Sequence, residues 1–317
     1  MALCVGIDEN GLGPRLGPLV VTAVLARVAP GAEQIVRRAP SGALGRRLGD
    51  SKVLVAHGRT AIAEAWARAL AARGAGRHER CSRPAELLRS LLLDDEAALR
   101  EPCPAHAAAQ CWSEEGEAFS AAADGFLEEV QGDLRALAAQ GVQPVAVRSV
   151  LVCARSLNRA AAEGRSRFDE DLHAMERLVL AMRELAGEPV CAVCGKVGGR
   201  HDYASALGPL AGRQCTPIEQ GPARSAYRIA GVGEVAFARD ADASDLLVGL
   251  ASLVGKYLRE LVMARVVRYY RRAVPELPDA SGYWDPVTAR FVRDSEPVRR
   301  ALALPDACFE RGRRAVP

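Results

Sequence analysis

The sequence predicts an α/β fold: a mixed sheet with an antiparallel start, flanked by helices. Two observations carry this prediction. Apolar and β-branched runs alternate with amphipathic helical segments along the chain. The first two runs, residues 3–7 and 19–28, are joined by a loop rich in glycine and proline, which indicates a hairpin. With 317 residues, 49% of them apolar, the chain is long enough to bury a sizeable core.

Further strands and helices follow in alternating order. Strands are expected over residues 145–153, 190–194 and 232–238, and helices over residues 59–73, 168–185 and 244–272. The helix at 168–185 carries apolar side chains on one face: Leu172, Met175, Leu178, Val179 and Met182. The longest pattern, 244–272, is apolar over much of its girth. Its first half should therefore be buried, with Ser244 as the N-cap.

The order of elements suggests one main domain with two additions. We expect the α/β domain to span residues 1–265, with an insertion at about 75–145. Within the insertion, residues 84–93 and 118–139 show short helical patterns. Residues 266–317 are expected to form a helical and turn-rich C-terminal extension, because turn residues become frequent from about Pro275 onward.

Composition limits the class of protein. The net charge of +3 neither demands nor excludes a nucleic-acid partner. Nine cysteines, an odd number without the spacing of a small disulfide scaffold, favour free thiols in a reducing cytoplasm. No apolar run approaches the roughly 18 residues of a membrane span, and no charged leader precedes an apolar run at the start. We therefore expect a cytoplasmic protein with no membrane partner.

Two adjacent carboxylates, Asp8 and Glu9, end the first predicted strand. Neighbouring residues on a strand point to opposite faces, so one carboxylate can enter a site while the other approaches from its edge. Strand ends are also where ligands gather in α/β sheets. Two exposed acids before a turn would give the same pattern, so these residues alone leave both interpretations open.

The segment Gly6 to Pro14, followed by Gly17-Pro18, resembles the opening signature of the type 2 ribonucleases H. That family begins with an Asp-Glu pair, a Gly-Arg-Gly-Pro loop and a second Gly-Pro. Weaker matches follow in the family's order at Asp50-Ser51-Lys52, Ser156-Leu157-Asn158, residues 171–182, 190–195 and 250–263, and Gly282-Tyr283. The resemblance covers most of the chain outside residues 75–145.

The resemblance implies a ribonuclease H-like fold of the type 2 or type 3 kind and a metal-dependent hydrolase. Such an endonuclease cuts RNA in RNA–DNA hybrids or at embedded ribonucleotides, using two Mg²⁺ or Mn²⁺ ions held by carboxylates. Carried over residue by residue, the metal ligands are Asp8, Glu9 and Glu260. Glu260 stands where type 2 enzymes have Asp and type 3 enzymes have Glu. The nucleic-acid duplex is the implied partner, and a monomer is the family expectation.

Cys194 stands where the family has its remaining carboxylate. A thiol is a soft ligand, poor for Mg²⁺, and at its ordinary pKa it is mostly protonated at neutral pH. The acids before the long helix include Asp240, Asp242 and Asp245. The last of these lies about 22 Å from Glu260 along a continuous helix, which makes it a poor substitute. We expect that either Asp202, on the loop after Cys194, compensates or that nothing does.

The substrate side of the resemblance rests on Gly11, Leu12, Gly13, Lys52 and Tyr283. In the family, the main chain of the Gly-Arg-Gly loop meets a 2′-hydroxyl, the group by which a protein tells RNA from DNA. Here Leu12 replaces the arginine, which could weaken the grip on phosphate. Tyr283 could stack on a sugar, or it could be a half-buried packing residue.

Three hypotheses follow. The first is an active ribonuclease H-like endonuclease, impaired to some degree by Cys194. The alternative is a catalytically inactive protein of the same fold that binds nucleic acid or a protein partner. A different nucleotide or phosphate enzyme is a distant third. The spacing of Cys191 and Cys194 is also that of a zinc or redox pair, but no second pair of Cys or His stands at standard spacing.

Overall fold

The computed structural model describes residues 1–49, 51–73, 81–197 and 200–312, so Asp50 of the Asp-Ser-Lys match lies outside the described residues. The described residues form one seven-stranded mixed sheet in the order β3-β2-β1-β4-β7-β6-β5. The strands are β1 (Ala2–Asn10), β2 (Leu19–Val28), β3 (Val142–Val152), β4 (Val190–Gly195), β5 (Cys215–Gln220), β6 (Arg224–Ile229) and β7 (Gly233–Ala238).

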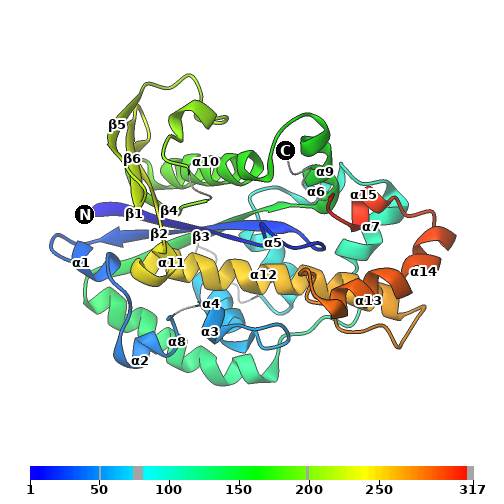
Figure 1. The fold of residues 1–317 in the computed structure, drawn as a ribbon. Coiled ribbons are helices and arrows are strands. Elements are labelled where there is room, and N and C mark those ends of the chain that lie inside the picture. Colours follow the sequence, from blue (N-terminus) through cyan, green and yellow to red (C-terminus); the bar gives the residue numbers. More distant parts are fainter. Residues whose placement is uncertain (50, 74–80, 198–199, 313–317) are drawn as a thin grey trace.

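Helices flank this sheet (Figure 1). The longer ones are α4 (Ala61–Ala71), α8 (Ala121–Ala139), α10 (Arg167–Ala186) and α12 (Leu246–Arg271). The shorter ones are α1 (Glu33–Val36), α2 (Gly42–Gly45), α3 (Ser51–Leu54), α5 (Pro84–Leu91), α6 (Glu96–Arg100), α7 (Ala105–Trp112), α9 (Ala154–Ala162), α11 (Ala241–Ser244), α13 (Pro286–Asp294), α14 (Glu296–Ala301) and α15 (Asp306–Phe309), with a 3₁₀ turn at Ala204–Ala206.

Strand β1 lies inside the sheet, between β2 and the middle strand β4. It pairs antiparallel with β2, as the predicted hairpin requires, and parallel with β4, with Ile7 opposite Cys194. Strand β4 also pairs in parallel with β7. Strand β6 lies between β7 and β5 and is antiparallel to both. The carboxyl ends of β1, β4 and β7 therefore point the same way. Asp8 and Glu9 are carried to that edge, beside Gly195.

The two faces of the sheet are covered by different helices. Alternate residues of β1 (Leu3, Val5 and Ile7) pack into the core under α10, while α12 covers the opposite face. Gly6 faces α12, and a Cβ added there would collide with the main chain of Leu247. The missing side chain therefore lets α12 pack directly on β1.

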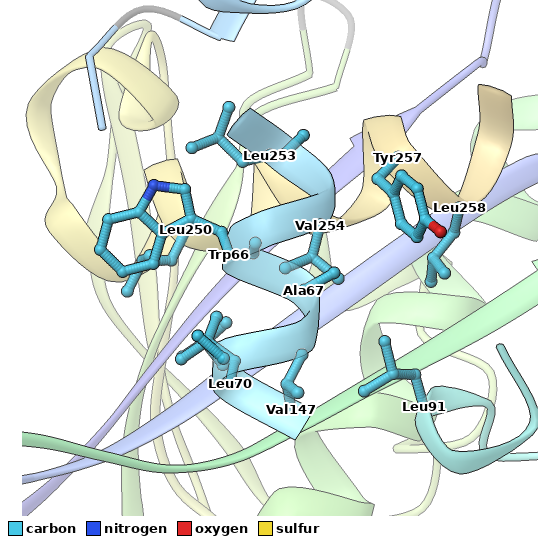
Figure 2. Packing of buried hydrophobic residues seen from close by; sticks show 14 of the residues in the cluster. Trp66, Ala67, Leu70, Leu91, Val147, Leu250, Leu253, Val254, Tyr257 and Leu258 are labelled. Atoms are coloured by element: carbon cyan, nitrogen blue, oxygen red, sulfur yellow. The ribbon is translucent and has the colours of Figure 1, made fainter. Parts of the chain in front are cut away.

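On the α12 face, α4 and the start of α12 form the main core. Trp66 and Leu70 of α4 interdigitate with Leu250 and Val254 of α12, as Figure 2 shows. The indole Nε1 of Trp66 donates to the carbonyl of Arg47 at 2.7 Å, which satisfies the one polar atom of this buried ring. This packing holds the first half of α12 against the rest of the core, and the helix carries side chains to the edge of the sheet.

The C-terminal helices pack on the far end of α12. Tyr270, Phe291 and Phe309 stack edge-to-face or offset with one another, and they share a core with Met263 and with Leu16 of the loop after β1. In the part of the chain that the structure describes, no helix combines the length and apolarity needed to span a bilayer.

The predicted architecture is confirmed, namely a mixed sheet flanked by helices with a helical C-terminal part. The N-cap of α12 was predicted wrongly. Oδ1 of Asp245 accepts from the amides of Leu247 and Val248 at 3.0 and 3.1 Å, whereas the Ser244 hydroxyl donates to the carbonyl of Asp240. Strands β5 and β6 were not predicted, because β5 is almost wholly exposed and contains Pro217.

Candidate active site

Asp8 and Glu9 place their carboxylates together at the end of β4. A Cβ added to Gly195 would lie 3.0 Å from Oδ1 of Asp8 and 3.1 Å from Oε2 of Glu9. Gly195 therefore leaves the space that the two carboxylates occupy. Asp8 is buried and Glu9 is partly buried, so neither is simply an acid exposed before a turn.

Burial raises the pKa of Asp8 to about 7, and the negative charge of Asp242 contributes, while a hydrogen bond from Ser252 and the charge of Lys256 act in the opposite direction. Burial also raises the pKa of Glu9 well above its usual range, followed by repulsion from Asp171 and Asp8. The strand end is thus a place where several negative charges are held close together with little solvent.

Asp242 of α11 joins the group from the side of α12. It is partly buried, and its Oδ2 lies 3.8 Å from Nζ of Lys52 on α3. The neighbouring Ser51 hydroxyl lies 2.9 Å from that of Ser252, the residue that bonds to Asp8. Of the described residues in the Asp-Ser-Lys match, Lys52 therefore contacts the carboxylate of Asp242, and Ser51 contacts Ser252, the residue that bonds to Asp8.

Asp171 of α10 joins the group from the opposite face of the sheet. It is 0% exposed, and neither carboxylate oxygen has a hydrogen-bond partner among the described residues. Burial and then repulsion from Asp8 raise its pKa well above the usual range. Sequence reasoning missed this residue, although the sequence held a signal: Asp171 sits four residues before Met175 and seven before Leu178, on the apolar face of the helix.

Cys194 is fully buried and faces the α10 side of the sheet, whereas Cys191 is exposed. Burial, and then the charge of Asp171, raise the pKa of the Cys194 thiol far above neutrality, so it is uncharged at pH 7. Asp202, the residue considered as a substitute, is exposed and its Oδ1 accepts from the amide of Ala204 at 3.0 Å. The negative charge of Asp242 raises the pKa of both Asp8 and Glu9, and that of Asp171 raises the pKa of Glu9.

Glu260 lies further along α12. Ser252 contacts Asp8, and Glu260 follows it by eight residues, which is about 12 Å along a helix. Its two oxygens are engaged elsewhere: Oε2 lies 2.7 Å from Nδ1 of His57, and Oε1 accepts from Arg259 at 2.7 Å. The structure therefore places Glu260 in a charged cluster with His57 and Arg259, whereas Asp242 is an acid whose charge acts on both Asp8 and Glu9.

The glycine-rich loop after β1 is held by side chains from distant parts of the chain. The carbonyl of Gly11 accepts from Arg311 at 2.5 Å and that of Gly13 from Trp284 at 3.1 Å. Leu12 is partly buried, and its carbonyl accepts from Arg167 at 3.3 Å. These three carbonyls are thus already paired within the chain.

Tyr283 is 48% exposed, and its ring stacks under the guanidinium of Arg259 at 4.6 Å. Trp284 beside it is 47% exposed, and the guanidinium of Arg15 lies 5.3 Å from its ring. Exposed aromatic rings beside arginines are typical of surfaces that stack on bases or sugars and contact phosphate. This pair lies next to the glycine-rich loop, because Trp284 bonds to Gly13.

The donor set of the strand end fits a hard divalent cation. Its carboxylates are buried and repel one another, and Asp171 has two unpartnered oxygens, an arrangement that a bound cation would relieve. As the side chains stand, no three His, Cys, Asp or Glu residues within the described ranges are gathered closely enough to hold an ion. Binding would therefore require these side chains to close in.

Comparison with known proteins gave matches to solved structures only. No protein-family model and no curated protein matches the sequence. The chain is similar to a chain of the PCNA:RNase HII complex from Archaeoglobus fulgidus, with a TM-score of 0.42 and 15% identity, over 99% of this chain and 96% of that one. It is also similar to Bst-RNase HIII in complex with Mn²⁺, with a TM-score of 0.44 and 12% identity, over 98% and 66%.

A further similar structure is the ribonuclease H2 from Pyrococcus horikoshii, with a TM-score of 0.37 and 15% identity, over 97% of this chain and 92% of that one. The chain spans about two thirds of the Bst-RNase HIII chain and nearly all of the two type 2 chains. All three are ribonucleases H of type 2 or type 3, the enzymes that the opening motif of the sequence resembles.

Proposed function

We propose that this chain is a ribonuclease H-type endonuclease that hydrolyses the RNA strand of RNA–DNA hybrids or cuts at embedded ribonucleotides. The observation that carries the proposal is the placement of Asp8 and Glu9 beside Gly195 at the carboxyl ends of β1 and β4, with Asp242 of α11 acting electrostatically on both. The resemblance of the loop after β1 to the type 2 signature supports the same conclusion. The proposal includes the intracellular location, the divalent-metal requirement and the nucleic-acid partner.

In this proposal Asp8, Glu9 and Asp242 would hold Mg²⁺ or Mn²⁺, with Asp242 in the role that the sequence resemblance implied for Glu260. Bound ions of this kind activate a water molecule and stabilise the leaving oxygen of a phosphodiester. The hydrogen bond from Ser252 to Asp8 and the contact of Lys52 with Asp242 fix the orientation of the carboxylates. The exclusion of solvent around Asp8 strengthens every electrostatic interaction there.

The substrate strand would lie along the glycine-rich loop. Gly11 has a φ of +87°, and Gly13 is exposed with open space around its Cβ position, so a ribose can approach the main chain. Tyr283 and Trp284 would stack against the sugar or base next to that position, because both rings are about half exposed beside the loop. Leu12 contributes no charge, and the guanidinium of Arg15 beside Trp284 is paired with Glu310.

The decisive experiment is cleavage of labelled duplexes, one a full RNA–DNA hybrid and one with a single embedded ribonucleotide, in Mg²⁺ and in Mn²⁺. We expect cleavage that is lost in Asp8→Asn, and the duplex that is cut faster identifies the substrate type. A folded wild-type protein that cuts neither duplex with either metal would contradict the proposal.

A second candidate is a nucleic-acid binding protein that has kept the fold and lost the chemistry. Two observations favour it: the uncharged, buried Cys194 at a position where the family has a carboxylate, and the loop carbonyls already occupied by Arg311, Arg167 and Trp284. It predicts duplex binding without cleavage. Cys194→Asp separates the two candidates, because a gain in cleavage rate of several orders of magnitude would show an impaired enzyme.

A further inference from the structure

Asp171 occupies a position of α10 that packing alone would fill with an apolar residue. It lies on the stripe formed by Met175, Leu178 and Val179, which packs against the sheet, and it is 0% exposed. Its two carboxylate oxygens have no hydrogen-bond partner within the described part of the chain. A carboxylate buried without partners weakens a fold, so a structural role does not explain this residue.

Asp171 lies on the helix that packs over the strand ends, within electrostatic range of the cluster there. Among charged side chains, Asp171 raises the pKa of Glu9 and that of Cys194 more than any other. Asp8 in turn is the charge that raises the pKa of Asp171. Asp171 therefore reaches the cluster from the face covered by α10, which is also the face on which Cys194 lies.

We propose that Asp171 is the metal ligand that replaces the carboxylate missing from the end of β4. Helix α10 then supplies the ligand that β4, with Cys194 at that position, does not. The inference rests on the proposed function. It explains two observations together: a neutral thiol at position 194, and an unpartnered buried carboxylate on the helix that faces it. Among the residues that the structure describes, the carboxylates acting on one another near the strand ends then include Asp8, Glu9, Asp171 and Asp242.

The experiment compares Mn²⁺ binding, measured by isothermal titration calorimetry at one pH, in wild type, Asp171→Asn, Cys194→Asp and the double variant. We expect Asp171→Asn to weaken Mn²⁺ binding by about 10- to 100-fold, a typical effect of disturbing a metal site. In the double variant, the carboxylate restored on β4 should recover most of that loss. Recovery by Cys194→Asp is a result that a purely structural role of Asp171 would not produce.

Glu176 provides a matched control on the same helix. It is also a buried acid, but its oxygens accept from the amides of Gly208 and Leu210, at 2.7 Å for the bond from Leu210. Glu176→Gln should leave Mn²⁺ affinity unchanged while lowering the melting temperature. Asp171→Asn should do the reverse. It should weaken Mn²⁺ binding, but in EDTA it should melt at the wild-type temperature or above, because it removes a buried carboxyl group without breaking a hydrogen bond.

Three results would overturn the inference. The first is wild-type Mn²⁺ affinity in Asp171→Asn, and the second is lost affinity that Cys194→Asp does not recover. The third is an Asp171→Asn protein that unfolds in EDTA, which would assign Asp171 to the fold. In each case Asp8-dependent binding and cleavage in the wild type would leave the proposed function standing. Absence of Mn²⁺ binding in the wild type would end both proposals.

Discussion

At the scale of single residues, one arginine decides the shape of the loop beside the carboxylates. Arg311 is buried, and its guanidinium donates to the carbonyl of Gly17 at 2.8 Å and to that of Gly11 at 2.5 Å. Burial, and then repulsion from Arg259 and Arg167, lower its pKa to about 9. The loop conformation therefore depends on a cation placed among other cations.

We expect Arg311→Met to lower the free energy of unfolding by about 2 kcal/mol, because two carbonyls of the loop lose their donor. The loss is moderated by relief of repulsion among the arginines. Urea unfolding measures it. Arg300→Met is the control: that side chain is 80% exposed, so its replacement should change stability by less than about 0.5 kcal/mol. Equal effects of both variants would contradict the role given to Arg311.

A second prediction at this scale concerns two acids, one just before α12 and one within it. On the proposed function, Asp242→Asn should reduce cleavage by about 100-fold or more, because it removes a cation ligand. Glu260→Gln should reduce cleavage only modestly, since that carboxylate is engaged by His57 and Arg259. Initial rates on the preferred duplex decide the matter, and the opposite ranking would restore Glu260 to the role implied by the sequence resemblance.

At the scale of elements, a buried carboxylate joins α4 to α8. Glu64 on α4 accepts from the amide of Ser120, the N-cap of α8, at 3.0 Å and lies 3.4 Å from Arg68. Burial raises its pKa to about 7. A folded pKa above the unfolded one means that the proton stabilises the fold at low pH, and that this stabilisation disappears as the pH rises through about 7.

Glu64→Gln keeps an acceptor for Ser120 and cannot ionise. Its stability relative to wild type should therefore rise by about 2 kcal/mol between pH 5 and pH 8. Urea unfolding at the two pH values gives the difference. Glu86→Gln on α5 should show no such rise, because bonds from Ser82 lower the pKa of Glu86. A pH-independent difference for Glu64→Gln would refute the argument.

Elements with a clear pattern could be predicted, and their contacts could not. The strand at 19–28 and the helix at 168–185 match β2 and α10 closely, because burial on one face or on both leaves a period in the sequence. Strand β5 leaves none, since nearly all of its residues are exposed. The N-cap of α12 is Asp245 and not Ser244. Both residue types can cap a helix, so the sequence cannot distinguish them, and the backbone geometry decides which one does.

The candidate site shows the same division. Asp8 and Glu9 could be found because they are adjacent and precede a distinctive loop. Asp171 and Asp242 could not be assigned, because their approach to Asp8 depends on the packing of α10 and α11 against the sheet, which no local pattern encodes. The signal that was present at Asp171, an acid within an apolar stripe, was hidden by the apolar majority around it.

At the scale of the whole molecule, the C-terminal helices share a core with the sheet domain. Phe291 of α13 and Phe309 of α15 pack with Leu16 and Met263, and α12 continues without a break to Arg271, past the boundary expected at residue 265. We therefore propose that residues 266–312 fold together with the α/β domain and not after it.

Phe291→Ala should lower the free energy of unfolding of the entire protein by about 3–5 kcal/mol in a single transition, because it opens a cavity in a shared core. Far-UV circular dichroism and tryptophan fluorescence should report the same midpoint. Val287→Ala, on the exposed face of the same helix, should have almost no effect. Separate midpoints for the two signals would show that the C-terminal part unfolds by itself.

The bond between Arg311 and Gly11 joins residues 300 positions apart in the sequence. On the ribosome, the residue that fixes the loop after Asp8 and Glu9 is therefore translated 300 codons after Gly11. A growing chain that has already made Asp171 and Asp242 still lacks the donor that holds this loop. A message truncated before the codon for Arg311 would yield a protein with its acids in place and its loop unsupported.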